Sequence, residues 1–413
     1  MIAAEHKLHA APAEVATPAG ESEAAEILRE CSRFKTAVVP CGSGLHQHIG
    51  LAPQPPFVAL KSERLTQVEY YDPGDLTIGV GAGMTLRELD ALVKPHGQWL
   101  PVLAFPDRAS GGNATIGGLL ATAMHGPLKH AFGGVREFCI GVRFVTGDGM
   151  RAKGGGRVVK NVAGYDLMKL LIGSYGTLGV ITSASFKLFP RPRQTATFVC
   201  RFPGLQNAMA VRDALMASPL APLALEIISP GAAALLHGHA DDAGWRVLLR
   251  ASGSDQQLAR YRGHLGNAAS AELTGEDEAA AWSLLENFES ALPPDAVVVA
   301  VSCPLSDVAQ VLRSAERAAL ERKISWAGIG RACTGSLLIA FLGGSRPEQS
   351  ISAVHALRAS APPSANAVIR RCPDSLKAGI ALWQLREGEL EIMRTFKNAL
   401  DPAWILNRGR YFV

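Results

Sequence analysis

The stretch VVKNVAGYDLMKLLIGSYGTLGVIT, Val158–Thr182, carries the strongest structural signal in the chain. Its glycines Gly173, Gly176 and Gly179 recur every third residue, directly after an apolar run typical of a helix. A second apolar run follows them at once. Because glycine has no side chain, we expect that something approaches the backbone closely at this turn.

Length and composition restrict the fold and the partners. At 413 residues the chain is long enough for two domains, and 48% hydrophobic with only 19% charged residues supports a large core. The 42 glycines and 25 prolines predict many turns. A net charge of +4 is too small to indicate nucleic-acid binding, and it suits an anionic cofactor equally well.

The seven cysteines lie far apart and form no CxxC pair. The spacing of a zinc ribbon, an iron–sulfur cluster or a disulfide framework is therefore missing. The first twenty residues lack the apolar segment of a secretory signal, and no apolar run approaches the ~18 residues of a membrane helix. We expect a cytoplasmic protein, or one held peripherally at the inner face of the plasma membrane through partner proteins, without nucleic acid among its partners.

The order of segments predicts an α+β protein. Residues 1–20 form an N-terminal extension, and residues 21–190 alternate strand-like runs, glycine turns and helices. The prolines of FPRPRQ, residues 189–194, indicate a hinge. Residues 191–387 then repeat strand–helix–strand, which predicts a ferredoxin-like antiparallel sheet with helices on one side. We expect residues 388–413 to return to the first domain.

Three further glycine-rich segments are candidates for a binding site. CGSGLHQHIG, residues 41–50, follows a strand and can direct backbone N–H groups at a phosphate, or form an ordinary surface turn. GVGAGMTLREL, residues 79–89, has Met84 at the third glycine position of a dinucleotide fingerprint, which favours a structural turn. Residues 106–134 are rich in small residues and can lie along a flat ligand, with hydrogen bonds from Ser110, Asn113, Thr115 and Thr122.

Taken together, KNVAGYDLMKLLIGSYGTLGVIT, the earlier ATIGG segment and the terminal LDPAWILNRGRYF resemble the motifs of vanillyl-alcohol-oxidase-type flavoproteins. The resemblance implies a PCMH-type FAD-binding domain of two subdomains, followed by a cap domain. Tyr175, at a position where many relatives carry glutamate, and FPRPR resemble the FAD-binding subunits of bacterial glycolate oxidases, those of the E type. The similarity covers roughly residues 70–195 and 400–411 and is poor in between.

This resemblance implies an extended FAD, bound without a covalent link. The loop at residues 42–46 would hold the pyrophosphate, the small-residue segment would lie beside the flavin and ribityl chain, and the Gly176 segment would contact the adenine end. The residues that it assigns to the cofactor are Gly42, Ser43, Gly44, Leu45, His46, Ser110, Ala114, Thr115, Ile116, Gly117, Gly118, Thr122, Ala123, Gly126, Gly176, Thr177, Gly179, Val180 and Ile181.

Several polar residues allow more than one interpretation. His46 can contact phosphate, lie exposed to solvent, or bind the flavin 8α-methyl group covalently, as a histidine of this region does in some relatives. Tyr165 and Asp166 can form an acid/base pair, although helix capping by Asp166 is the simpler role. Lys160 can approach the cofactor or stay solvated.

Other residues are candidate ligands for a metal or a carboxylate. His237 and His239 have no second histidine cluster to complete a metal site, so we expect no metal. The arginine pair at 370–371 can clamp a carboxylate or remain solvated. Arg408 and Arg410 can fold back toward FAD. The sequence assigns no catalytic base.

The resemblance implies oxidation of glycolate or another 2-hydroxy acid to the 2-oxo acid, with hydride transfer to flavin N5. It also implies two partners, a D-type flavin subunit and an iron–sulfur subunit that accepts the electrons. Two alternatives stay open: a flavin-bearing electron-transfer or scaffold subunit without substrate chemistry of its own, and an NAD(P)H-dependent flavin reductase.

Overall fold

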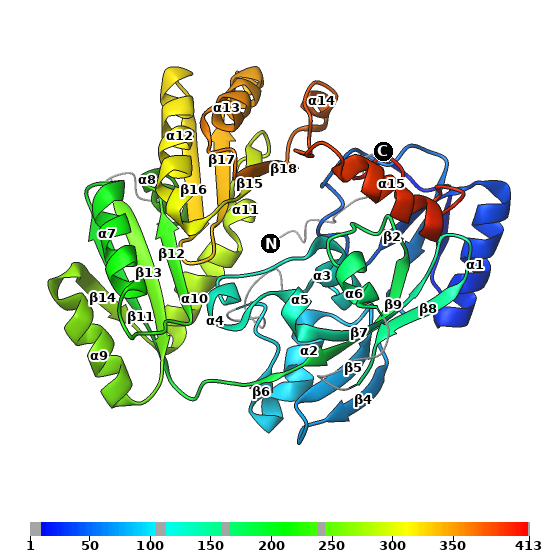
Figure 1. The fold of residues 1–413 in the computed structure, drawn as a ribbon, viewed down its shortest axis with the longest axis horizontal. Coiled ribbons are helices and arrows are strands. Elements are labelled where there is room, and N and C mark those ends of the chain that lie inside the picture. Colours follow the sequence, from blue (N-terminus) through cyan, green and yellow to red (C-terminus); the bar gives the residue numbers. More distant parts are fainter. Residues whose placement is uncertain (1–9, 104–112, 158–164, 238–243, 412–413) are drawn as a thin grey trace.

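The computed structural model describes residues 10–103, 113–157, 165–237 and 244–411, which fold into two halves built on β-sheets (Figure 1). The N-terminal half begins with a small parallel sheet. Its strands, in spatial order, are β1 (Glu14–Ala16), β3 (Phe57–Lys61) and β2 (Ala37–Cys41). Helix α1 (Glu21–Phe34) connects β1 to β2 and buries one apolar stripe, as an amphipathic helix does.

A five-stranded antiparallel sheet forms the centre of the N-terminal half. Its strands, in spatial order, are β4 (Val68–Asp72), β5 (Thr77–Gly81), β9 (Val180–Lys187), β7 (Cys139–Val145) and β8 (Arg151–Gly155). Short helices share its apolar core, namely α2 (Leu86–Val93), α3 (Ile116–Thr122), α5 (Val135–Phe138) and α6 (Leu167–Leu171). The glycine-rich turn 79–89 is structural, as expected, because it leads from β5 into α2, where Thr85 and Glu88 form a capping box.

The second half contains one large antiparallel sheet of eight strands. In spatial order they are β14 (Ala269–Leu273), β11 (Thr195–Phe202), β13 (Trp245–Ser252), β12 (Ala224–Ile228), β16 (Ser325–Arg331), β17 (Ser336–Leu342), β15 (Val297–Ser302) and β18 (Asn366–Arg371). Helices pack on both faces of this sheet, so the expectation of helices on one side is wrong. The second layer exists because the inner sheet face is also apolar and needs a cover.

The two helical layers have different neighbours (Figure 1). The outer layer consists of α7 (Leu205–Met216), α9 (Asp255–Leu265), α12 (Val308–Glu321) and α13 (Pro347–Ser360). The inner layer consists of α8 (Pro230–His237), α10 (Gly275–Glu286) and α11 (Phe288–Ala291). Short 3-10 turns η1 (Lys94–His96), η3 (Gly266–Ala268) and η4 (Leu305–Asp307) and the helix α14 (Asp374–Lys377) complete the connections. Trp99 and Leu128 of the N-terminal half join the inner core.

The segment that connects the two halves is fixed by strand pairing and an ion pair. Strand β10 (Phe189–Pro190) pairs with β6 (Gln98–Trp99) of the N-terminal half. The guanidinium of the following Arg191 pairs with the buried carboxylate of Asp90 and lies 5.3 Å from the centroid of the Trp99 ring. The short helix α4 (Lys129–Phe132) contacts β12 across the same junction. The prolines that indicated a hinge therefore lie in a fixed connection.

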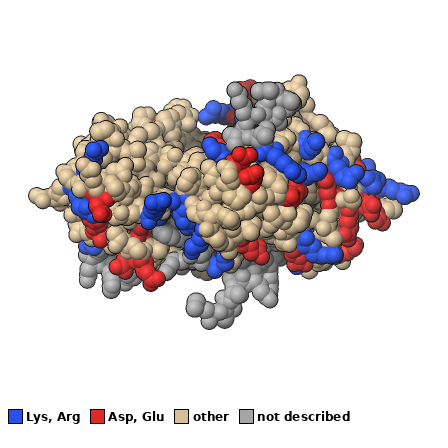
Figure 2. Space-filling view, turned by 90° about the horizontal axis from the view of Figure 1, so that it is seen from below, with Lys and Arg blue, Asp and Glu red and all other residues tan. Residues whose placement is uncertain are grey.

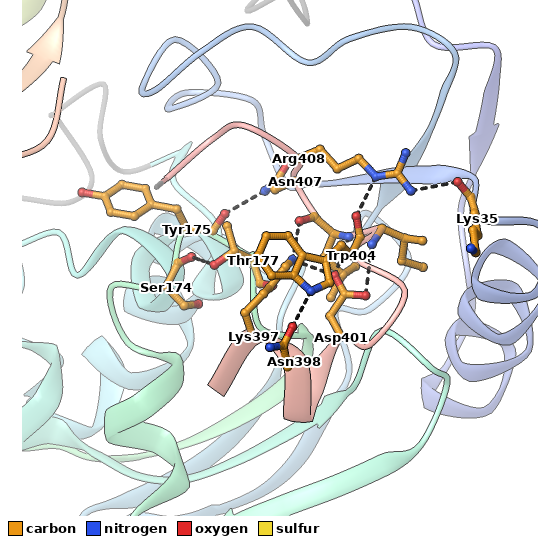
Figure 3. Close-up of polar contacts among 12 residues, drawn as sticks. Lys35, Ser174, Tyr175, Thr177, Lys397, Asn398, Asp401, Trp404, Asn407 and Arg408 are labelled. Atoms are coloured by element: carbon orange, nitrogen blue, oxygen red, sulfur yellow. Dashed lines mark hydrogen bonds and ion pairs between the residues drawn. The ribbon is translucent and has the colours of Figure 1, made fainter. Parts of the chain in front are cut away.

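The C-terminal helix α15 (Glu389–Leu400) returns to the N-terminal half and is anchored there by one buried ion pair (Figures 1 and 3). The Lys397 ammonium donates to the Asp401 carboxylate at 2.6 Å and to the carbonyls of Thr177 and Leu406 at 2.8 and 2.9 Å. The Asp401 carboxylate also accepts the backbone N–H groups of Ile405 and Leu406. Since both charges are satisfied, their burial is tolerated.

Two further observations concern partners of the fold. Within the described ranges, no helix combines the length and the apolar content that crossing a bilayer requires. On the face shown in Figure 2, uncharged residues cover most of the surface, and the Lys and Arg side chains lie beside Asp and Glu side chains. This mixed pattern agrees with the small net charge.

Removing one partner of the buried ion pair should destabilise the protein strongly. Asp401→Ala leaves the Lys397 ammonium buried without its counter-charge, and we expect a loss of about 3–5 kcal/mol in the free energy of unfolding. Arg394→Ala, at an exposed position of the same helix, is the control and should change stability by less than about 0.5 kcal/mol. Urea unfolding followed by circular dichroism measures both. Equal stabilities of the two variants would show that the pair does not anchor the helix.

Candidate functional site

A long cleft of about 830 Å³ runs through the N-terminal half, between the small parallel sheet and the five-stranded sheet. Three glycine-rich segments that are far apart in sequence form its walls: the loop after β2, the start of α3 with the residues before it, and the turn into β9. The sequence-predicted residues that line it are Gly42, Ser43, Gly44, Leu45, His46, Ala114, Thr115, Gly117, Gly118, Thr122, Gly176, Gly179, Val180 and Ile181.

The remaining predicted residues lie elsewhere. Ile116 is fully buried in the core because it occupies the opposite face of α3, and Thr177 lines a separate pocket beside the C-terminal tail. Ala123 lines a second cavity, described below. Gly126 packs against the carbonyl of Val102, and Ser110 lies outside the described residues.

Close packing within the chain accounts for the glycines of the opening stretch. Gly173 and Gly176 have φ of +84° and +68°, a conformation that side chains disfavour. A Cβ on Gly179 would lie 2.9 Å from a ring carbon of Phe144, and one on Gly176 would lie 3.0 Å from the Asn407 amide. The groups that approach this backbone most closely are therefore side chains of the protein, Phe144 and Asn407. Gly176 and Gly179 also line the cleft.

Gly118 differs from these glycines because a side chain there has room. A Cβ on Gly118 would meet only the Thr115 hydroxyl, at 3.2 Å, within 4 Å. By contrast, a Cβ on Gly42 would lie 2.1 Å from the same hydroxyl. The space that a side chain at position 118 would occupy is therefore part of the cleft, whereas at position 42 the fold itself requires glycine.

The C-terminal tail contributes two residues to the cleft: Arg410, which the sequence offered as folding back toward the cofactor, and Asn407, which it did not. Asn407 and Arg410 line it, and the Asn407 amide donates to the Tyr175 carbonyl at 2.7 Å (Figure 3). Arg408 points away, with its guanidinium bonded to the carbonyls of Trp404 and Lys35. The terminal motif that resembles the flavoprotein tail was the available signal, but sequence alone does not show where a tail lands.

A second cavity of about 930 Å³ opens between the two halves. Strands β15 and β18 supply one wall, and the end of α3 with the residues that follow it supplies another. Thr122 and Tyr175 line both cavities, so the two adjoin. An aromatic cluster of Tyr175, Trp383 and Tyr411 borders this junction, with ring centroids 4.5–5.3 Å apart.

His125 and Arg370 are the two residues with ionisable nitrogen that line the second cavity. The Nδ1 atom of His125 is buried and has no hydrogen-bond partner among the described residues. Burial lowers the pKa of His125 to about 2, with contributions from the nearby charges of Arg331, Lys129 and Arg370. Its imidazole is therefore neutral at physiological pH and available for a hydrogen bond.

The arginine pair at 370–371 does not act as a unit. Successive residues of a strand point to opposite faces. The Arg370 guanidinium lines the cavity and pairs with the Glu289 carboxylate at 2.8 Å, whereas Arg371 donates to the carbonyls of Glu289 and Pro293. A two-arginine clamp is therefore wrong, and Arg370 alone faces the cavity.

The polar residues considered for acid/base chemistry or metal binding do not form such a site within the described ranges. Tyr165 is 90% exposed, which argues against an acid/base pair in a cleft, and Asp166 pairs with Lys169 instead of capping α6 with its side chain. Lys160 and His239 lie outside the described residues, as does the His237 side chain. Within the described ranges, no three His, Cys, Asp or Glu side chains gather as a metal site would require.

The neutral state of His125 predicts a pH dependence of stability. The unfolded chain takes up a proton at this histidine below pH ~6.5, whereas the folded protein does not, so stability falls as the pH drops from 7 to 5. His125→Gln should reduce this loss by about 1–2 kcal/mol. His264→Gln, at an exposed position on α9, should leave the loss unchanged. Urea unfolding at both pH values provides the measurement, and identical pH dependence in the His125 variant and the parent would contradict a neutral, buried imidazole.

Comparisons with known proteins agree with the fold. The chain matches the family described as FAD binding domain over residues 12–154, and the C-terminal domain of FAD linked oxidases over residues 191–368 and 376–411. The solved structure of p-cresol methylhydroxylase with substrate bound superimposes with a TM-score of 0.74 at 15% identity, over 97% of this chain and 88% of that one. The predicted α+β, PCMH-type fold is confirmed.

Among sequence relatives, glycolate oxidase subunit GlcD of Bacillus subtilis is 26% identical over 97% of this chain and 89% of its own length. Glycolate oxidase subunit GlcE of Escherichia coli is 43% identical, but only over 34% of this chain and 39% of its own length. The similarity thus supports the wider family and does not single out the E-type subunit. The chain belongs to the FAD-linked oxidases, an oxidoreductase family whose cofactor is FAD.

Proposed function

We propose that this chain is the FAD-binding, E-type subunit of a glycolate-oxidase-like complex that converts glycolate or another 2-hydroxy acid to the 2-oxo acid. One observation carries the proposal: the glycine-walled cleft and the polar second cavity adjoin at Thr122 and Tyr175. A cofactor in the first can therefore meet a small molecule in the second. Similarity to the subunits GlcD and GlcE supports the choice of substrate class.

The residues of the cleft fit FAD. Glycine, alanine, serine and threonine make up a large part of its walls, which lets an extended dinucleotide approach the backbone. Backbone N–H groups of the Gly42–His46 loop would hold the pyrophosphate, Thr115–Thr122 would lie beside the flavin and ribityl chain, and Gly176–Ile181 would contact the adenine end. His46 lines the cleft, and we assign it to a phosphate contact, with covalent attachment to the flavin as the alternative.

Chemistry in the second cavity would use its polar residues. When bound, the flavin supplies a hydride acceptor. The Arg370 guanidinium would receive the substrate carboxylate, in exchange for part of its pairing with Glu289. The neutral imidazole of His125 would accept the hydroxyl proton. A weak base suffices for this step, because a hydroxyl becomes strongly acidic as hydride leaves its carbon.

We further propose that electrons leave through partners, a D-type flavin subunit and an iron–sulfur subunit. All seven cysteines are free thiols, and among the described residues no three His, Cys, Asp or Glu side chains gather as a cluster site would need, so we assign the iron–sulfur centre to a partner. In this assembly the protein would be cytoplasmic or peripheral at the inner face of the plasma membrane. Residues 21–190 would act as the FAD domain, 191–387 as the cap and 388–413 as the returning segment.

A second candidate function is a flavin-bearing electron-transfer or scaffold subunit that leaves substrate chemistry to its partner. The ion pair between Arg370 and Glu289 favours it, because a guanidinium already neutralised by a carboxylate binds a second one less strongly. Anaerobic reduction by 2-hydroxy acids distinguishes the two functions, and reduction by NADPH tests for an NAD(P)H-dependent flavin reductase.

Filling the cleft should abolish cofactor binding without unfolding the protein. In Gly118→Leu the new side chain enters the space left open beside Thr115, so we expect purified protein that retains its circular dichroism but loses flavin absorbance. Gly263→Leu, at a helical glycine with open space around it, is the matched control and should keep the flavin. A yellow Gly118→Leu protein with unchanged FAD content would place the cofactor elsewhere.

Anaerobic reduction tests the substrate chemistry. Glycolate or D-lactate added to the isolated holoprotein should bleach the flavin, and Arg370→Met should raise the half-saturating concentration at least about tenfold, since a charge-assisted pair is lost. Lys323→Met, at an exposed surface position, should behave like the parent. If no 2-hydroxy acid bleaches the flavin, the scaffold function is favoured; bleaching by NADPH alone would favour the reductase.

A further inference from the structure

Two cationic side chains from distant parts of the chain bind the loop after β2, residues 42–50. Arg410 in the C-terminal tail donates from one guanidinium nitrogen to the carbonyls of both Gln47 and Ile49, the latter at 2.6 Å. Lys377 in α14 donates to the carbonyl between them, that of His48, at 2.8 Å. Three consecutive carbonyls, those of residues 47–49, are thus bound by side chains 329 to 363 residues further along the chain.

Both cations are buried and geometrically fixed. Arg410 is 4% and Lys377 5% exposed, and each makes more than one contact. Arg410 also donates to the side-chain carbonyl of Gln47 at 2.8 Å, and Lys377 pairs with Asp374 at 2.7 Å. The tail backbone lies directly on the loop, since a Cβ on Gly50 would be 1.9 Å from the Arg410 carbonyl oxygen. Few other rotamers are open to side chains held this way.

These contacts determine how the peptide planes of the loop are oriented. A carbonyl that is held in place also fixes the N–H group of the following residue, because the two groups belong to one planar peptide unit. The three bound carbonyls therefore fix the N–H groups of residues 48–50, directly after the cleft-lining part of the loop. The preceding residues, Gly42–His46, line the cleft, and so does Arg410 itself. The loop is therefore held in shape before any ligand arrives, which lowers the entropic cost of binding one.

We propose that Arg410 and Lys377 are positioning residues for the cofactor: they hold the 42–50 loop in the shape that receives the anionic pyrophosphate of FAD. This inference rests on the proposed use of the loop for the pyrophosphate. It makes FAD affinity depend on two elements outside the FAD domain, the tail and the α14 segment of the cap. Cofactor binding is thereby coupled to the docking of the second half.

A competing physical account is simple attraction between positive charge and phosphate. Arg410→Lys separates the two accounts, because it keeps the charge but loses the planar guanidinium, whose two terminal nitrogens together bond two main-chain carbonyls and the Gln47 side chain. Positioning predicts that Arg410→Lys and Arg410→Met lose FAD affinity alike, whereas charge attraction predicts that Arg410→Lys stays close to the parent.

The experiment is a fluorescence titration of the full-length apoprotein with FAD, with thermal unfolding of each apoprotein as the check on folding. We expect Arg410→Lys and Lys377→Met to weaken FAD binding by about tenfold or more, as for loss of hydrogen bonds to a charged group. Arg408→Met is the matched control, because Arg408 contacts the carbonyls of Trp404 and Lys35 and not the loop, and it should stay within about twofold of the parent.

An Arg410→Lys protein that binds FAD as tightly as the parent would overturn the proposal. If that variant does not fold, Lys377→Met decides, and a change of less than about twofold would overturn it equally. Failure of the parent to bind FAD at all would instead contradict the use of the cleft for FAD. The two failures are therefore distinguishable.

Discussion

The fold depends on the absence of a side chain at Gly176 and Gly179, in the turn between α6 and β9. This turn is approached from two sides, by Phe144 of the sheet at Gly179 and by Asn407 of the tail at Gly176. Because the tail can reach the turn, the Lys397 ammonium can bond the Thr177 carbonyl, and Asn407 and Arg410 of the tail can line the cleft. A larger residue at this turn would separate the tail from the sheet and open the cleft. The same two glycines therefore allow the close packing of sheet and tail, and they also form part of the cleft wall.

The interior of the second half is polar as well as apolar. Beneath the inner helices, the guanidinium of Arg250 and the carboxylate of Glu278 pair at 3.0 Å, and Glu278 also accepts hydrogen bonds from Thr195 and Thr197. Such a buried pair contributes little net stability but penalises any arrangement that separates the charges. Burial, reinforced by the charges of Arg331, Lys129 and Arg370, lowers the pKa of His125 and keeps its imidazole neutral. The electrostatic character of the second cavity is thus set by the packing of the cap against the N-terminal half.

The sequence was informative where a motif fixes the backbone and less so where a helix or a distant contact decides. The glycines at 42, 117, 118, 176 and 179 were expected at one site and line one cleft. Ile116 was included with its neighbours, but helical periodicity turns it into the core. Of the two arginines expected to fold back toward the cofactor, Arg410 lines the cleft and Arg408 does not. Asn407 was missed as a cleft residue, because sequence alone does not show where the tail meets the first domain. The inner helical layer was missed because strand–helix alternation does not reveal which face a helix covers.

The central claim is that this cleft holds FAD by main-chain and small-residue contacts, without a covalent bond. A visible absorption spectrum of the purified, folded protein, recorded before and after acid precipitation, tests it most directly. The account predicts a yellow protein whose flavin stays in the supernatant when the protein precipitates. A folded protein that is colourless and takes up no added FAD would contradict the account, and a yellow pellet would contradict the non-covalent assignment at His46.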